Sequence, residues 1–200
     1  MGYTCLMLLS LLLAAATPMA AIEAADPNCA YDRDAMLALD FQTFDQDPNG
    51  GWRALANEGC YIEAAELIRE WRYVNRSNRS TLFLHEGQMR AFAGQTMEAV
   101  ELFQVSYKSP IINAESGFNH YVDATIFFLV QDRELFDSAL ESLAATPVPE
   151  ESGIALEEGG EWPPNIRVVR AMERCWERSY LEAYMSPQCY PHLDENQAAD

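Results

Sequence analysis

An acidic turn, residues 45–50 (DQDPNG), is the first pattern in the chain that could do chemistry. Its spacing matches the first half of a calcium-binding loop between two helices, in which Asp and Asn side chains bind the ion. A complete loop needs a glutamate at its twelfth position, and that position is Ala56. Because half a ligand set binds calcium weakly, the pattern favours a polar helix stop over a calcium site.

A stripe of arginines follows later in the chain. Arg167, Arg170, Arg174 and Arg178 recur every three or four residues, which places them on one face of a helix. One interpretation is a site for an anionic ligand. The other is neutralisation by the acidic segment 150–161, which directly precedes this helix. The large excess of acidic residues favours the second interpretation.

No residue pattern defines a catalytic or metal site. The three histidines, His85, His120 and His192, lie far apart in sequence and lack the spacing of metal ligands. We expect His120, which lies beside an apolar segment, to be a hydrogen-bonded core residue. Nucleophile motifs and phosphate-binding glycine loops are absent from the sequence. The sequence therefore predicts a non-catalytic protein without cofactor or metal, and an enzyme with a site assembled from distant residues is the less favoured alternative.

The cysteines indicate two disulfides. Of the five in the chain, Cys5 lies in the apolar N-terminal segment, which leaves Cys29, Cys60, Cys175 and Cys189. Four cysteines in an oxidising compartment allow three pairings. Cys29 precedes the first predicted helix and Cys60 follows a short returning one, so both are expected at the same end of the molecule. We therefore favour Cys29–Cys60, which leaves Cys175–Cys189.

Residues 1–25 are typical of a secretory signal peptide. An apolar stretch is followed by small residues that end near Ala25. An uncleaved membrane anchor is the alternative, because residues 3–22 are just long enough to span a bilayer. The alanines and Thr17-Pro18 favour cleavage. The sequence thus predicts a periplasmic or secreted protein in which residues 26–200 form one domain, with no membrane span after signal removal.

The charge of the chain limits its partners. It has 31 acidic and 13 basic residues and a formal net charge of −18. Only one charged residue, Glu23, lies in the segment 1–25, so the remainder carries −17. Such a surface repels nucleic acid and anionic lipid, and it suits a basic partner.

Hydrophobic spacing predicts helices throughout and no strand. The expected helices are 32–46, 52–58, 61–75, 81–94, 97–107, 118–130, 132–145 and 165–185. An acidic loop rich in Pro and Gly, 146–164, precedes the last helix, and a polar tail, 186–200, follows it. The short connections at Gly59 and at Gly94-Gln95 predict antiparallel helix hairpins.

Two of these hairpins are related by an internal repeat with an offset of 35 residues. The matching pairs are Gly59/Gly94, Glu63/Glu98, Ala64/Ala99 and Ile68/Phe103. The glycines allow a tight turn between the helices, and the alanines allow the second helix to approach the first. The large apolar residue lies one turn further along the same face.

This pattern resembles the tetratricopeptide repeat over residues 45–147. The second unit has the expected residue types at Phe83, Gly87, Gly94, Ala99 and, nearby, Pro110. It departs from the pattern at two positions, where Glu86 replaces a leucine and Arg90 a tyrosine. The first unit has a shortened first helix, and a third unit near 118–147 keeps only the repeat's alanine, as Ala139, and the hairpin outline.

The resemblance implies an all-α fold in which three hairpins stack as a short right-handed array, capped by the C-terminal helix 165–185. Such arrays bind segments of other proteins on the concave face of their first helices. Alignment places Arg53, Asn57 and Gln88 on that face, and Asn119 nearby. We therefore expect a protein-binding module whose partner is another protein or a peptide, preferably basic. The alternative function is an acidic inhibitor or immunity-type protein that neutralises a basic exported enzyme.

Overall fold

The computed structural model describes residues 29–148 and 161–190, and within these ranges the fold is all-helical with no strand. The predicted signal peptide, most of the acidic loop and the tail from residue 191 lie outside the described residues. No helix in the described ranges is long and apolar enough to cross a membrane.

The N-terminal region differs from the sequence prediction in one element. Instead of one helix over 32–46, the chain forms a short helix and then a π-helical turn. Asp32 caps the first by accepting a bond from the Ala35 backbone N–H, and Asp40 accepts a bond from Thr43 N at 2.9 Å. The second bond favours a new start of helical structure over continuation. The elements are α1 (Arg33–Leu37), the π-turn (Gln42–Gln46), α2 (Gly51–Asn57) and α3 (Tyr61–Val74).

The middle region follows the prediction closely. Its helices are α4 (Ser80–Phe92), α5 (Thr96–Val105), α6 (Pro110–Ser116), α7 (Phe118–Leu129) and α8 (Arg133–Ala144). Gly94 adopts a φ of +76° between α4 and α5, a conformation that glycine accepts without strain. Helix α6 is an addition, since Pro110 begins a helix as well as following α5. The proline ring fixes a φ suitable for a first helical turn.

The C-terminal region also departs from the prediction. The expected single helix 165–185 is wrong, because the chain turns after Arg174 and starts a second helix at Tyr180. Ser179 and Glu182 form a reciprocal capping box that satisfies the first backbone N–H groups of this second helix. The elements are α9 (Ile166–Arg174), α10 (Tyr180–Met185) and a 3-10 turn (Pro187–Cys189).

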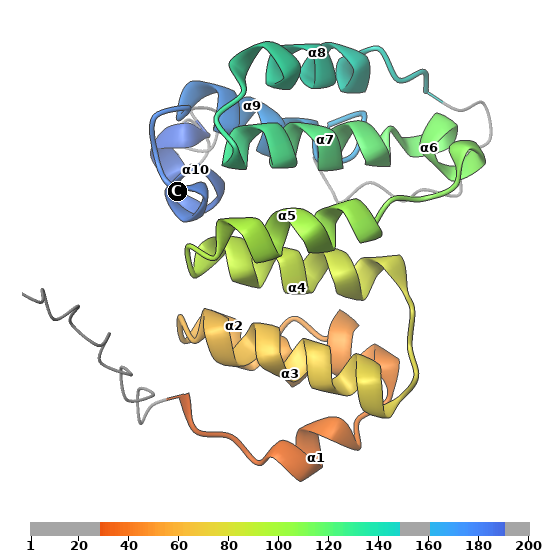
Figure 1. The fold of residues 1–200 in the computed structure, drawn as a ribbon, viewed down its shortest axis with the longest axis vertical. Helices are drawn as coiled ribbons and strands as arrows, with labels where there is room; N and C mark the ends of the chain where they lie inside the picture. The colour runs from red at the N-terminus through yellow and green to blue at the C-terminus, as the bar shows by residue number, and fades with distance from the viewer. Residues whose placement is uncertain (1–28, 149–160, 191–200) are drawn as a thin grey trace, which may run out of the picture.

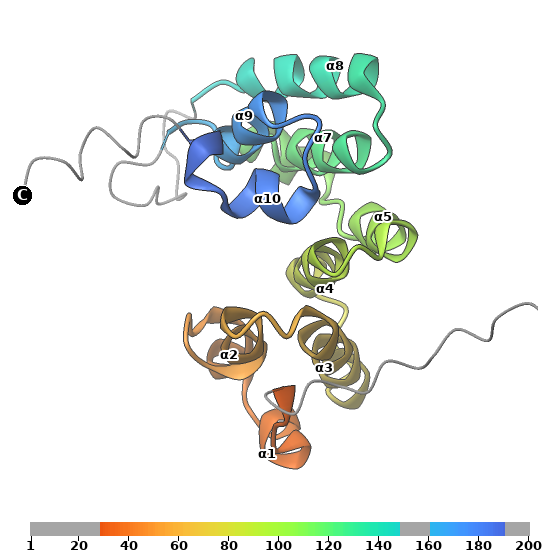
Figure 2. The same ribbon diagram turned by 90° about the vertical axis from the view of Figure 1, so that its left-hand side faces the viewer.

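The helices follow one another along the long axis of the molecule (Figure 1). Consecutive helices α3, α4 and α5 pack together, as do α7 and α8. Helices α9 and α10 return along one side of this stack, where α9 contacts α7 and α8 and α10 contacts α4 (Figure 2). The C-terminal segment thus covers part of a face formed by earlier helices.

Helix α4 contributes to two hydrophobic cores. Leu82 and Met89 pack in a core with α1, α2 and α3, whereas Leu84 and Ala91 pack in a core with α5 and α7 to α10. Phe92 packs against both. The two cores therefore share one helix as a common wall.

Repeat positions meet between α4 and α5. A Cβ atom on Gly87 would lie 3.0 Å from the Phe103 ring and 3.3 Å from the Ala99 carbonyl oxygen. Ala99 and Phe103 are both fully buried. Glycine at position 87 therefore permits the close approach of the two helices.

Two disulfides join Cys29 to Cys60 and Cys175 to Cys189, the pairing that the sequence favours. The Cα atoms are 5.6 Å and 5.9 Å apart, respectively. The first ties the segment before α1 to the start of α3, and the second ties the end of α9 to the 3-10 turn after α10.

Candidate functional site

The two predicted partner-binding residues on α2 both contact the acidic turn. Arg53 donates from Nε to the Asp45 carbonyl oxygen at 2.8 Å, and its guanidinium lies over the Trp52 ring. Asn57 is exposed and donates from Nδ2 to the Pro48 carbonyl oxygen at 3.1 Å. Both side chains therefore help to hold the turn, and they lie near one end of the helical stack.

The other two predicted residues are also used within the fold. Gln88 is buried and donates from Nε2 to the hydroxyls of Tyr121, at 3.1 Å, and Tyr184, at 3.4 Å. Asn119 accepts a bond from the Lys108 backbone N–H and donates one to its carbonyl oxygen. The structure does not bring these two residues together with Arg53 and Asn57.

Helix α10 covers the part of α4 that carries Gln88. Phe92 of α4 packs against Tyr180 and Tyr184 with ring centroids 5.4 Å and 5.3 Å apart, and against Tyr61 of α3 at 5.2 Å. Tyr180 is buried by this packing. This part of the predicted concave face is therefore occupied by a helix of the same chain.

A buried carboxylate links the acidic turn to α4. Asp45 is fully buried, and its Oδ1 lies 2.7 Å from His85 Nδ1 and 3.0 Å from Trp52 Nε1. Burial alone would raise the pKa of Asp45. The hydrogen bonds from His85, Trp52 and Gln46, together with the charge of His85, outweigh burial and hold this pKa below its usual value.

The sequence did not predict this Asp–His pair, because its residues lie 40 positions apart and belong to no local motif. Carboxylates orient histidines in many enzymes. Here the same carboxylate oxygen also accepts the Trp52 indole N–H, so the pair connects the π-turn, α2 and α4. Its clearest role is to fix the turn.

The acidic turn uses its aspartates in contacts within the fold. Asp45 points its carboxylate into this buried network, and Asp47 accepts a bond from the Asn49 backbone N–H at 2.9 Å, as a polar turn requires. In the described part of the chain, one cluster has metal-ligand residue types: Cys29, Cys60 and Glu63. Its two cysteines form a disulfide and cannot act as thiolate ligands.

The two departures from the repeat pattern form an ion-pair network between α3 and α4, which we call the α3–α4 network (Glu66, Arg72, Glu86 and Arg90). Glu86 accepts bonds from Arg72, including one from Nε at 3.1 Å, and lies 3.8 Å from Arg90. Arg90 donates to Glu66 at 2.6 Å. The side chain of Glu86 is only 3% exposed. The charges of Glu86 and Arg90 on α4 are therefore compensated mainly by Arg72 and Glu66 of α3.

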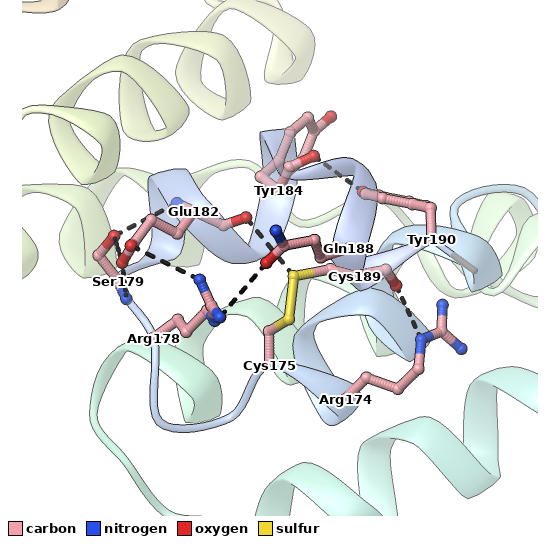
Figure 3. Close-up of a disulfide and its surroundings, with 9 residues drawn as sticks. All are labelled: Arg174, Cys175, Arg178, Ser179, Glu182, Tyr184, Gln188, Cys189 and Tyr190. Atoms are coloured by element: carbon pink, nitrogen blue, oxygen red, sulfur yellow. Dashed lines mark hydrogen bonds and ion pairs between the residues drawn. A yellow bond between two sulfur atoms is a disulfide. The ribbon is translucent and has the colours of Figure 1, made fainter. Parts of the chain in front are cut away.

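Three of the four arginines in the C-terminal stripe surround a cavity of about 280 Å³, which we call the α9 cavity (Arg167, Arg170, Arg174, Tyr190 and Glu161). Arg174 donates from Nε to the Cys189 carbonyl oxygen at 2.7 Å, and Tyr190 donates to the Tyr184 carbonyl oxygen at 2.9 Å (Figure 3). Arg170 forms an ion pair with Glu161. This pair is one case of the predicted neutralisation, and the rest of the acidic segment lies outside the described residues.

The fourth arginine and the tyrosine define the limits of the cavity. Arg178 lies outside it, 3.9 Å from Glu182 (Figure 3). Burial and the nearby Tyr184 raise the pKa of Tyr190 to about 12, although Arg167 and Arg174 oppose this rise. Tyr190 is therefore a neutral phenol at physiological pH, and the charge of the cavity comes from its arginines and Glu161.

His120, which the sequence predicts to be a core residue, is only half-buried near the start of α7.

The chain matches no protein-family model, no curated protein and no solved structure.

Proposed function

We propose that this chain is an exported, non-catalytic helical-repeat protein that binds another protein along the face formed by α2, α4 and α10. The observation that carries the proposal is the packing of α10 on α4, in which Phe92 contacts both Tyr180 and Tyr184. This face already buries a short helix, and α2 lies on the same side of α4 (Figure 2). Grooves between helices are a common way to bind helical segments of other proteins.

The close approach of Gly87 to Ala99 and Phe103 supports a tetratricopeptide-like arrangement as part of this proposal. These are the positions at which that repeat brings its two helices together. We propose that the pairs α2–α3, α4–α5 and α7–α8 are three degenerate repeats in a right-handed array, and that α9 and α10 cap it. The α3–α4 network would then replace the usual apolar contacts of the second repeat.

The cellular compartment and the net charge of the chain limit the kinds of partner that it can bind. Two disulfides suit an oxidising compartment, which is the periplasm or the exterior of the cell. A net charge of −17 beyond the proposed signal peptide favours a partner with a basic binding segment.

Site-specific photo-crosslinking tests the proposal in the native cell envelope. A photoreactive side chain at Arg53 or Asn57 on α2 should capture a distinct protein. The same group at Glu101, which is exposed on α5, serves as the matched control. The proposal is wrong if the α2 positions and the control position capture the same background proteins.

The charge also favours a second candidate function, an inhibitor of a basic exported enzyme. The same experiment separates the two, because the captured partner would be an enzyme whose activity falls when the purified chain is added in equimolar amount. A captured partner without enzymatic activity would exclude inhibition and leave the binding function in place.

A further inference from the structure

The α9 cavity has an unusual charge for this molecule. The chain has more than twice as many acidic as basic residues, yet three arginines and a single carboxylate, Glu161, line this cavity in the described part of the chain. In the α3–α4 network, by contrast, Arg72 and Arg90 each contact a glutamate. Within residues 29–148 and 161–190, carboxylates therefore neutralise both α3–α4 arginines and, among the cavity arginines, Arg170.

The positions of the three arginines suit a common ligand. Arg167, Arg170 and Arg174 recur at intervals of three and four residues, so their side chains project from one face of the helix that ends at Arg174. Within residues 29–148 and 161–190, Arg167 forms no hydrogen bond and no ion pair. Its guanidinium is therefore not neutralised by a described carboxylate. Arg174 uses Nε to bind the Cys189 carbonyl oxygen, which orients its two terminal nitrogens as further donors.

A disulfide holds the non-arginine part of the cavity lining in place. The Cys175–Cys189 disulfide ties the segment that carries Tyr190 to the end of α9, and Tyr190 is anchored to the Tyr184 carbonyl oxygen (Figure 3). The lining of the cavity therefore combines arginine donors from α9 with an anchored aromatic side chain, Tyr190. A preorganised wall lowers the entropy lost when a ligand binds.

We propose that the α9 cavity binds a small oxyanion with at least two negative charges, of the phosphate or polycarboxylate type. Guanidinium groups donate paired hydrogen bonds to the oxygens of both groups, and such charge-assisted bonds are the stronger kind. A volume of about 280 Å³ admits an anion of this size with some water. The ligand competes with Glu161 for Arg170, so the site opens by exchange of one carboxylate for another anion.

Calorimetric titration of the oxidised chain with inorganic phosphate and, separately, with citrate tests this proposal at low ionic strength. Saturable binding of either anion is expected, and the anion that binds more tightly identifies the phosphate or the carboxylate chemistry. Arg167→Ala should weaken binding about tenfold or more, because it removes charge-assisted hydrogen bonds. Arg178→Ala, which removes a nearby arginine outside the cavity, should leave the affinity unchanged.

Glu161→Gln provides a variant with the opposite expected sign. It removes the carboxylate that pairs with Arg170 and should therefore strengthen binding several-fold. Far-UV circular dichroism confirms that each variant is folded, and Arg167 is suitable because it has no hydrogen-bond partner in the described residues to lose. The proposal is overturned if neither anion binds saturably below about 10 mM, or if Arg167→Ala and Arg178→Ala have the same effect.

Discussion

The α3–α4 network and the α9 cavity use the same residue type in two different ways. In the network, Arg72 and Arg90 are 14% and 10% exposed and are compensated by glutamates from neighbouring turns and from the adjacent helix. In the cavity, Arg170 is 41% exposed and pairs with Glu161, and Arg167 has no carboxylate partner among the described residues. Arg72 and Arg90 lie on two adjacent helices, whereas the cavity arginines share one face of α9. The positions of the carboxylates therefore decide whether an arginine stabilises the fold or remains available to a ligand.

A large effect is expected from removing the buried carboxylate of the network. Glu86→Leu leaves the charges of Arg72 and Arg90 without their buried partner, and the free energy of unfolding should fall by about 3 kcal/mol. Urea denaturation measures this change. Glu101→Leu, at an exposed position of α5, is the matched control and should change stability by less than about 0.5 kcal/mol.

A double variant sharpens this prediction. Arg72→Met combined with Glu86→Leu removes most of the uncompensated charge and should recover part of the lost stability, since apolar pairs often replace buried ion pairs without cost. If Glu86→Leu alone costs no more than the Glu101 control, the network does not stabilise the fold and the contrast with the cavity is wrong.

Removal of each disulfide should affect stability and oxyanion binding differently. Replacing Cys175 and Cys189 with alanine should cost about 3 kcal/mol in the loop-entropy model and should also weaken oxyanion binding, because Tyr190 and the Cys189 carbonyl are released from α9. Replacing Cys29 and Cys60 should cost about 4 kcal/mol for its longer loop and leave binding unchanged. Thermal denaturation and calorimetric titration of both variants give the comparison, and equal losses of binding would contradict it.

The buried Asp45 adds a pH dependence to the N-terminal core. Asp45→Asn should lower the free energy of unfolding by about 2 kcal/mol at pH 7, because the carboxylate that binds His85 and Trp52 is lost. The pKa of Asp45 is lowered in the folded state, so its stabilising contribution is complete above the unfolded pKa. That contribution is lost as the pH falls through the folded pKa.

Urea denaturation at decreasing pH follows this effect. The difference between wild type and Asp45→Asn should shrink as the solution becomes more acidic than the folded pKa of Asp45. Asp47→Asn alters an exposed carboxylate in the same turn and should show no comparable trend. A difference that stays constant with pH would show that the Asp45 charge does not contribute.

The smallest effect is expected at the edge of the network. Arg69 pairs with Glu66, but its side chain is 59% exposed, so Arg69→Ala should change the free energy of unfolding by less than about 1 kcal/mol. Added salt should reduce even this difference. Urea denaturation at low and high ionic strength measures both quantities, and a loss as large as that of Glu86→Leu would show that exposure does not distinguish these pairs.

The sequence predicted the helical class and the turns at Gly59 and Gly94 from local signals. It predicted the cysteine pairing from the ends at which the expected helices place each cysteine. It missed the division of 165–185 into two helices, although Ser179 and Glu182 form a capping-box pattern that marks the boundary. It also missed the break after Leu37, where an aspartate inside an apolar stripe starts a new turn.

The side-chain contacts within the candidate sites were harder to predict from the sequence. Nothing local relates Asp45 to His85, since tertiary packing alone brings them together. The sequence marked Glu86 and Arg90 only as departures from a repeat pattern. Their roles could not be predicted, because their partners, Arg72 and Glu66, come from the preceding helix. For the same reason, the placement of Gln88 beneath α10 depends on a chain reversal that the helical spacing does not encode.

The helix shared by the two cores has a consequence for unfolding. Repeat proteins often lose structure one unit at a time, because each unit contacts only its neighbours. Here Leu82 and Met89 belong to one core, and Leu84 and Ala91 of the same helix belong to the other, while α10 bridges back to it. Neither core can unfold without exposing the apolar residues that α4 contributes to the other core. We therefore expect the domain to unfold in one cooperative transition, despite its construction from successive helix pairs.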